Sequence, residues 1–196
     1  LFMDDEATSE FSNRSRTILT QLENFEPHDE RETESLARIR KLLINSNQDE
    51  ALGRDLSLHH LTGSAFMISE AGLLLHLHKK IQLWIQPGGH LDRGESPFEA
   101  AKRESFEETG IAAKFEQEIF HLDVHETPNG HVHYDFRYLA YCENVAPSPG
   151  ENESQDVKFF SERECQNIDD PALKGAIQKL INKGKFIEPG NFKVKS

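Results

Sequence analysis

The string GHLDRGESPFEAAKRESFEETGI, residues 89–111, contains the best-defined helix of the chain. Ser96 and Glu99 stand at the spacing of a capping box, and Pro97 falls at the first helical position, where its missing N–H costs nothing. Gly110 suits the left-handed residue that commonly follows a helix. These signals predict a helix over residues 97–109 and fix its register.

The predicted helix has two different faces. At roughly 100° per residue, an arc of roughly 140° carries four charged residues, Arg103, Glu104, Glu107 and Glu108. The other side suits packing on a sheet and carries Phe98, Ala101, Ser105, Phe106 and Thr109. Neighbouring carboxylates repel one another unless a cation lies among them, and hard oxygen ligands suit Mg²⁺ or Mn²⁺. A solvated acidic face is the alternative for this helix taken alone.

The residues before the helix favour a metal site over a solvated face. Gln86-Pro87-Gly88-Gly89 follows a strand-like run and leads toward the helix. Glycines permit a backbone turn that exposes carbonyls to a metal or amides to a phosphate.

The same stretch resembles the Nudix box. It reads Gly89, five residues, Glu95, seven residues, Arg103-Glu104, two residues, Glu107-Glu108, one residue, Gly110-Ile111. The resemblance implies a mixed α+β fold, a sandwich of a mixed sheet between helices, in a domain that we place at residues 58–196. It also implies a pyrophosphohydrolase that cleaves the diphosphate linkage of a nucleoside diphosphate derivative. Ser105 departs from the aliphatic residue that the family prefers there.

The resemblance also assigns roles to residues. The implied metal ligands are the Gly88 carbonyl and the carboxylates of Glu104, Glu107 and Glu108, and Arg103 fixes a neighbouring glutamate by bridging to it. Glu104 can instead take the proton from water. In this family the base is sometimes a glutamate from a distant loop. Glu151, Glu153 and Asp156 lie in such a loop, and we favour Glu153 as the extra ligand or base.

Strand-like runs flank the helix on both sides. Before it they lie at residues 64–69, 73–78 and 83–86, and after it at 113–117, 119–125, 131–142 and 156–160. A final helix is predicted at 171–183, where Asp170-Pro171 begins it and Gly184 ends it. The order of strands, helix, strands and helix predicts a mixed sheet flanked by helices.

Several histidines fall near the predicted site. Alternation along the strand 131–142 places four polar residues on one face, His131, His133, Asp135 and Arg137. We expect this face to bind substrate, with Asp135 and Arg137 paired, and we add His90, which ends a Trp84-to-His90 stretch similar to one Nudix subgroup. A zinc site of His125, His131 and His133 is the alternative, but no cysteine joins these residues and their spacing is not specific.

Residues 1–57 form a separate N-terminal arm with two helical patterns. Its apolar residues recur at helical spacing in two groups, Ile18, Leu19 and Leu22, then Leu36, Ile39, Leu42 and Leu43. A break near residues 27–29 separates the groups. An apolar stripe must be buried, so we expect the arm to join a homodimer or to cover an edge of the substrate pocket, with the dimer favoured.

Composition limits the partners. The 196 residues include 34 acidic and 22 basic side chains, for a net charge of −12, which argues against a duplex nucleic acid partner and for a cation wherever an anionic substrate binds. No apolar run reaches membrane length, and the first residues lack the order of a signal peptide. Two cysteines without a Cys-rich pattern indicate a reduced, cytoplasmic protein.

Two other functions stay open at this point. A Nudix fold without catalysis could bind a nucleotide-like ligand and regulate a partner, but such a binder has no need of the acidic cluster. A prenyl diphosphate isomerase would need an acid pair and usually a cysteine near the site. Cys142 lies on the apolar face of its predicted strand, which disfavours that chemistry.

Overall fold

A mixed sheet lies at the centre of the computed structural model, which describes residues 15–45, 57–150 and 156–187. Its main strand order is β3-β2-β1-β6-β5, with β4 paired to β1 and β7 paired to β2. The β1–β6 pair is parallel and the other pairs are antiparallel. The strands are β1 (His59–Ser69), β2 (Gly72–Leu77), β3 (Trp84–Ile85), β4 (Gly88–His90), β5 (Ala113–Glu126), β6 (Val132–Cys142) and β7 (Val157–Phe160).

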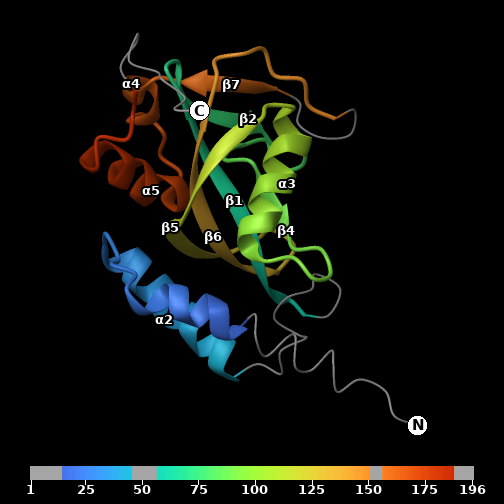
Figure 1. The fold of residues 1–196 in the computed structure, drawn as a ribbon, viewed down its shortest axis with the longest axis vertical. Helices are drawn as coiled ribbons and strands as arrows, with labels where there is room; N and C mark the ends of the chain where they lie inside the picture. The colour runs from blue at the N-terminus through green and yellow to red at the C-terminus, as the bar shows by residue number, and fades with distance from the viewer. Residues whose placement is uncertain (1–14, 46–56, 151–155, 188–196) are drawn as a thin grey trace.

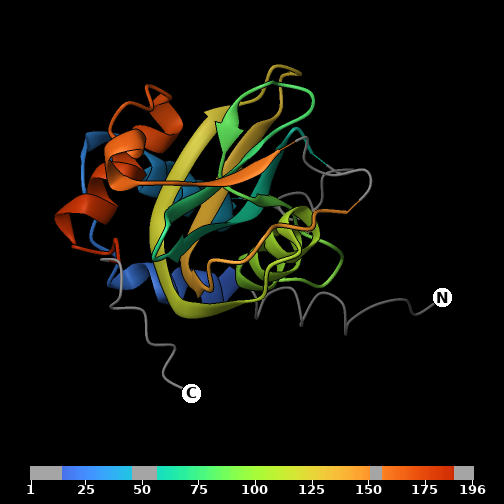
Figure 2. The same cartoon turned by 90° about the horizontal axis from the view of Figure 1, so that it is seen from above.

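Helices cover both faces of this sheet, which confirms the expected sandwich (Figures 1 and 2). The helix that carries the box, α3 (Pro97–Thr109), lies on one side, and α4 (Glu162–Cys165) and α5 (Pro171–Asn182) lie on the other. The arm contributes a helical segment at residues 15–23 and α2 (Glu30–Asn45). No helix in the three described ranges is long and apolar enough to cross a membrane.

Alternation along β1 determines which helix each side chain meets. Leu61 belongs to the apolar cluster that includes α3 and the arm, whereas Phe66 and Ile68 belong to the cluster that includes α5. Successive residues of a strand point to opposite faces, so the two clusters fill the two sides of one sheet. The face of β1 toward α5 has a polar half and an apolar half. His60, Thr62 and Ser64 form the polar half, and Phe66 and Ile68 form the apolar half.

The arm helix α2 packs along the edge strand β5 of the same chain. Leu36, Ile39 and Leu43 are buried in the cluster shared with β5 and β6, so the apolar stripe is covered without a second subunit. An edge strand has unpaired backbone N–H groups, and α2 binds two of them. The N–H of Leu122 donates to Glu32 Oε1 at 3.1 Å and that of Val124 to Ser35 Oγ at 3.1 Å.

A buried ion pair ties the arm to the last helix. The Glu32 carboxylate has no exposed surface, and Lys179 Nζ of α5 donates to both of its oxygens at 2.8 and 2.9 Å. Removing one partner of such a pair leaves an uncompensated buried charge. The contact therefore makes the arm a structural part of the folded domain in this chain.

Two local predictions differ from the structure, and one short helix was not predicted. The predicted Gly-Gly turn is instead the short strand β4, paired with β1. The runs at 113–117 and 119–125 form one strand, β5, with register shifts between Phe115 and His121, as a bulge produces. The short helix α4 was not predicted, although Ser161 and Glu164 form its capping box. Both cysteines are buried and free.

Candidate active site

The sequence signals that begin and end α3 are all present. Ser96 Oγ accepts from the Glu99 N–H at 3.2 Å, and Glu99 Oε2 accepts from the Ser96 N–H at 2.8 Å. Gly110 ends the helix in the left-handed conformation, with φ 69°. The predicted register of the carboxylates on this helix is therefore confirmed.

The packing face of α3 is rotated slightly from the predicted one. Ala101, Ser105 and Thr109 are buried as expected, but Phe106 is 55% exposed and Ala100 is buried in its place. Close approach to the sheet requires Gly63 of β1, because a Cβ at this position would lie 2.0 Å from the Pro97 carbonyl oxygen. Small residues on both elements thus let the helix lie directly on the strand.

As a result of this rotation, the three carboxylates differ in how far they are exposed to solvent. The side chain of Glu107 is 49% exposed, that of Glu104 19% and that of Glu108 only 11%. Glu108 therefore points inward, where the Gly88 N–H donates to its Oε2 at 2.8 Å. The Nε2 of His76 lies 3.6 Å from the same oxygen. Burial lowers the pKa of His76 to about 4, so this ring is neutral at pH 7.

Arg103 organises the remaining carboxylates, as predicted. Its Nη1 donates to Glu104 at 2.9 Å and to Glu107 at 3.2 Å. Glu95 binds the same guanidinium with both oxygens, at 2.8 Å each, and the His90 carbonyl accepts from Nη2 at 2.9 Å. The hydrogen bond with Glu95 is the main cause of the raised pKa of Arg103, and the same bond lowers the pKa of Glu95.

The two glycines before the helix are needed for close contact rather than for a turn. A Cβ on Gly89 would lie 2.5 Å from the Glu104 carboxylate, and a Cβ on Gly88 would lie 2.3 Å from Ser64 Cβ. Neither glycine has a positive φ. Close packing therefore requires glycine at both positions, and the role of the Gly88 carbonyl as a metal ligand stays a prediction.

This donor set fits a hard divalent cation. Glu104 and Glu107 both accept from Nη1 of Arg103, and Glu108, on the same helix, accepts from the Gly88 N–H. Carboxylate oxygens suit Mg²⁺ or Mn²⁺ better than softer ions. The site can therefore hold a metal that neutralises phosphate charge.

The predicted pair of Asp135 and Arg137 is present, but it lies inside the protein. Arg137 Nε donates to Asp135 at 2.8 Å, and the Arg137 side chain is 1% exposed. Asp135 also accepts from the hydroxyls of Thr62 and Ser64, at 2.9 and 2.8 Å. Arg137 also donates to the Ala172 carbonyl of α5. Protein groups already bond both side chains, so the pair holds strands and helix together, and the expected contact with substrate stays a prediction.

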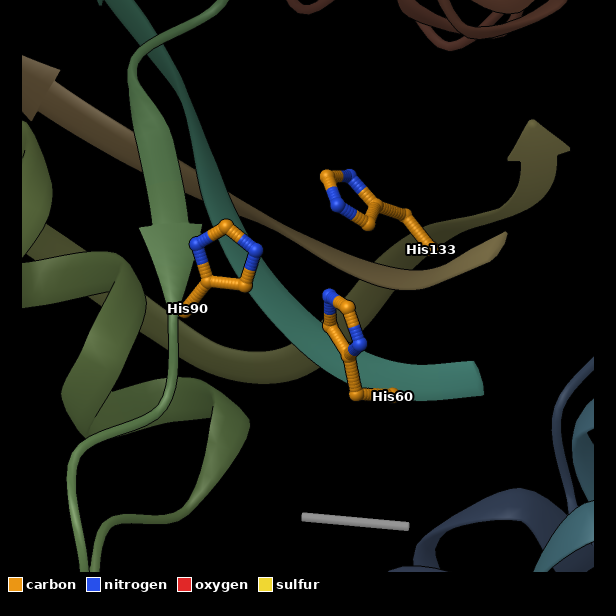
Figure 3. A group of neighbouring side chains, drawn as sticks. All are labelled: His60, His90 and His133. Carbon is orange, nitrogen blue, oxygen red and sulfur yellow. The ribbon is translucent and has the colours of Figure 1, made fainter. Parts of the chain in front are cut away.

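The predicted histidines divide into two groups. His90 and His133 are partly exposed and lie together with a residue that sequence reasoning left unassigned, His60 (Figure 3). His125 and His131 flank this group at ring-centroid distances of 5.3 Å, from His133 and His60 respectively. Sequence reasoning missed His60 because only the pairing of its strand with β6 brings it beside His133, and this pairing was not known from the sequence.

The predicted base Glu153 lies outside the described residues. The loop that leads to it is described as far as residue 150 and covers the end of α3. There the N–H of Ser148 donates to the Thr109 carbonyl at 2.8 Å, and that of Gly150 donates to the Glu107 carbonyl at 3.1 Å.

Comparison with known proteins agrees with this geometry. The NUDIX domain family matches residues 58–180, so the chain belongs to the Nudix family and is a Nudix-type hydrolase. A probable DHNTP pyrophosphohydrolase of Lactococcus lactis subsp. cremoris (strain MG1363) is 34% identical over 134 residues, 65% of this chain and 77% of that protein.

Two further proteins are similar to this chain. The phosphatase NudJ of Escherichia coli (strain K12) is 30% identical over 100 residues, 49% of this chain and 65% of NudJ. A NUDIX-family hydrolase from Clostridium perfringens has a solved structure that aligns with a TM-score of 0.56 and 29% identity, over 63% of this chain and 97% of that one. The family match at residues 58–180 covers the sheet and most of its flanking helices, and the arm lies outside that match.

Proposed function

We propose that this chain hydrolyses the diphosphate linkage of a nucleoside diphosphate derivative and requires Mg²⁺ or Mn²⁺. The observation that carries the proposal is the arrangement of Glu104, Glu107 and Glu108 around Arg103 and Gly88. Arg103 offsets only part of the negative charge of these carboxylates, and a divalent cation would offset the rest. The names of the relatives support the same reaction class, since one is a probable pyrophosphohydrolase and another a phosphatase.

Each residue of the site has a separate task in this reaction. Glu104, Glu107 and Glu108 hold the cation, together with the Gly88 carbonyl. When bound, the cation supplies neutralisation of the phosphate charge and activation of water. Arg103, fixed on its other side by Glu95, keeps the carboxylates of Glu104 and Glu107 in place between catalytic cycles.

The proton from the attacking water needs an acceptor. Glu104 is one candidate, because it is partly buried beside Gly89 and within reach of the same site. Glu153 is the other, and we favour it as an extra ligand or base. The hydrogen bond from the Gly150 N–H to the Glu107 carbonyl supports this choice. Residue 153 follows three positions later, and three residues span at most about 10 Å.

Substrate recognition is assigned to the histidines on the polar half of the sheet. His90, His131 and His133 are partly exposed, and His90 lies one residue beyond the glycine that touches Glu104. Neutral imidazoles can donate or accept hydrogen bonds to a sugar or base. We include all three in the proposed substrate-binding surface.

The two alternative functions predict different products. A nucleotide-binding regulator would show affinity without turnover, whereas a prenyl diphosphate isomerase would release an isomer and no phosphate fragments. The isomerase would need a reactive cysteine, but Cys142 is buried and burial raises the pKa of its thiol to about 12. Hydrolysis is therefore the function that the carboxylates support best.

The test is a substrate panel assayed with and without metal. Nucleotide sugars, dinucleotides and nucleoside triphosphates are incubated with Mg²⁺, with Mn²⁺ and with excess chelator, and phosphorylated fragments are separated. We expect fragments from at least one class, loss of turnover in chelator and recovery after metal is added back. Full turnover in a metal-free preparation, or no turnover on any class with either metal, would contradict the proposal.

A further inference from the structure

Three histidines from three different strands converge on one point (Figure 3). The ligand atoms of His60, His90 and His133 all lie within 4.8 Å of one another. His60 of β1 is the direct parallel partner of His133 in β6, and His90 of β4 is the antiparallel partner of Thr62, two residues further along β1. Their placement thus follows from strand register and does not depend on long, mobile side chains.

Two more imidazoles surround the group. His125 of β5 pairs with His133 across the β5–β6 ladder, and its ring centroid lies 5.3 Å from that of His133. The ring of His131 lies 5.3 Å from that of His60. The rings of His60 and His133 are 5.0 Å apart, and those of His90 and His133 are also 5.0 Å apart. Five imidazoles therefore line one end of the polar half of the sheet.

Hydrogen bonds orient two of these rings in the way that metal ligands require. His60 Nδ1 lies 3.0 Å from the Ser57 carbonyl oxygen, which can only accept, so Nδ1 carries the proton and Nε2 carries the lone pair. His125 Nδ1 makes the same kind of contact with Asp123 Oδ2 at 2.8 Å. Histidines that bind metals commonly donate their other N–H to a carbonyl or a carboxylate.

Histidines can also cluster through plain packing of their rings. The convergence of three ligand atoms and the orientation of His60 distinguish a metal site from such packing.

We propose that His60, His90 and His133 bind a divalent transition-metal ion of the Zn²⁺ class, at a site separate from the carboxylates of α3. Three imidazole nitrogens suit Zn²⁺, whereas Mg²⁺ and Mn²⁺ prefer the oxygen ligands of α3. A set of three histidines leaves a fourth position for water or a polar group of the substrate. Gly89 faces Glu104, so the next residue of β4, His90, points to the opposite face.

The test measures Zn²⁺ binding directly, on the full chain without a histidine tag. The protein is stripped with chelator, exchanged into buffer with excess Mg²⁺ to fill the carboxylate site, and titrated with Zn²⁺ in a calorimeter. We expect one Zn²⁺ to bind, and the His60→Gln, His90→Gln and His133→Gln variants each to lose at least about 10-fold in affinity. Absence of Zn²⁺ binding by the unmodified chain would overturn the proposal.

His59→Gln is the matched control. His59 is the neighbour of His60 in β1, but it is exposed, and its Nδ1 lies 3.1 Å from the hydroxyl of Tyr134. We expect His59→Gln and Glu107→Gln to keep the Zn²⁺ affinity of the unmodified chain. Equal affinity in His60→Gln and His59→Gln would exclude the assigned ligands.

A second measurement needs no variant, in case a buried substitution prevents folding. In the unmodified chain with ¹⁵N-labelled histidine, Zn²⁺ should shift the Nε2 resonance of His60 and leave that ring's Nδ1 protonated. Shifts confined to His28, His59 or His78 would overturn the proposal. Since the readout is binding rather than turnover, failure here leaves the proposed hydrolase reaction of the carboxylates intact.

Discussion

The carboxylates of α3 and the histidine cluster lie near each other but are built in opposite ways. The carboxylates come from residues 104–108 of a single helix, whereas the three clustered histidines span residues 60 to 133 and come from β1, β4 and β6. Helical periodicity alone brings the first group together. The second group exists only once three strands are paired in the correct register.

The two regions also differ in charge and in support. The carboxylates are compensated locally by Arg103, which Glu95 holds from the same loop and helix. The histidine side is flanked by a network that reaches the arm and α5, through Asp123, Arg137 and Glu32. A site made by one helix should therefore tolerate distant changes, whereas a site made by several strands should depend on the elements that hold those strands.

The largest effect that tests this difference is expected from Glu32→Ala. The change leaves Lys179 buried without its carboxylate and removes the acceptor of the Leu122 N–H in β5. We expect a loss of about 3–5 kcal/mol in the free energy of unfolding, because a buried charge is left unpaired. Urea unfolding measures it, and hydrogen exchange should show faster opening of β5 than of α3.

Glu34→Ala is the control for this change. Glu34 lies two residues away on α2 but is exposed, so its removal should stay within about 0.5 kcal/mol. Equal effects of the two substitutions would mean that the arm does not support the strands. The histidine cluster would then depend on distant elements no more than the carboxylates of α3 do.

A smaller change in free energy, with a large change in rate, is expected from Glu107→Gln and Glu108→Gln. Each should lower kcat/KM by about 10²-fold or more, by analogy with the loss of one preorganised electrostatic group. The fold should remain, because glutamine is close to glutamate in size and its side-chain oxygen can still accept these hydrogen bonds. Steady-state kinetics at saturating Mg²⁺ and a thermal melt measure the two outcomes.

Phe98→Ala, on the same helix, should lower stability and leave the catalytic rate of the folded protein unchanged. The ring is half-buried and lies 5.1 Å from the ring of Tyr138 and 5.9 Å from that of Phe115, so its loss should cost about 2–3 kcal/mol of stability. Turnover in the folded fraction should persist. A silent Phe98→Ala together with an unfolded Glu107→Gln would show that the two faces of α3 are assigned incorrectly.

The smallest expected effect is a change of folding stability with pH, caused by His121 in β5. Burial, with Arg137 next in importance, lowers the pKa of His121 in β5 well below its ordinary value. Below about pH 6.5 the unfolded chain takes up a proton at His121 that the folded chain does not, so folding stability falls as pH drops from 7 to 5. The urea midpoint of the wild type should fall over this range, and His121→Gln should flatten the fall. A steeper fall in the variant would contradict the assignment.

Much of the helical structure was predictable because its signals are local. The caps of α3, the break before α2 and the start of α5 each depend on residues within one helical turn, so the sequence alone locates them. The spacing of Arg103, Glu104 and Glu107 likewise places these side chains together without any tertiary contact. A homodimer through the arm stays a prediction, although the stripe on which it was based is buried within the chain.

Tertiary structure decided what lies across strands and between layers. Glu108 turned inward because α3 packs closely on Gly63, and Gly88 and Gly89 became a strand because they pair with β1. His60 joined His90 and His133 through strand register, which is set by long-range hydrogen bonds and by burial of one sheet face. Local periodicity determines which side chains share a helix face, but only the packed sheet determines which distant residues share a site.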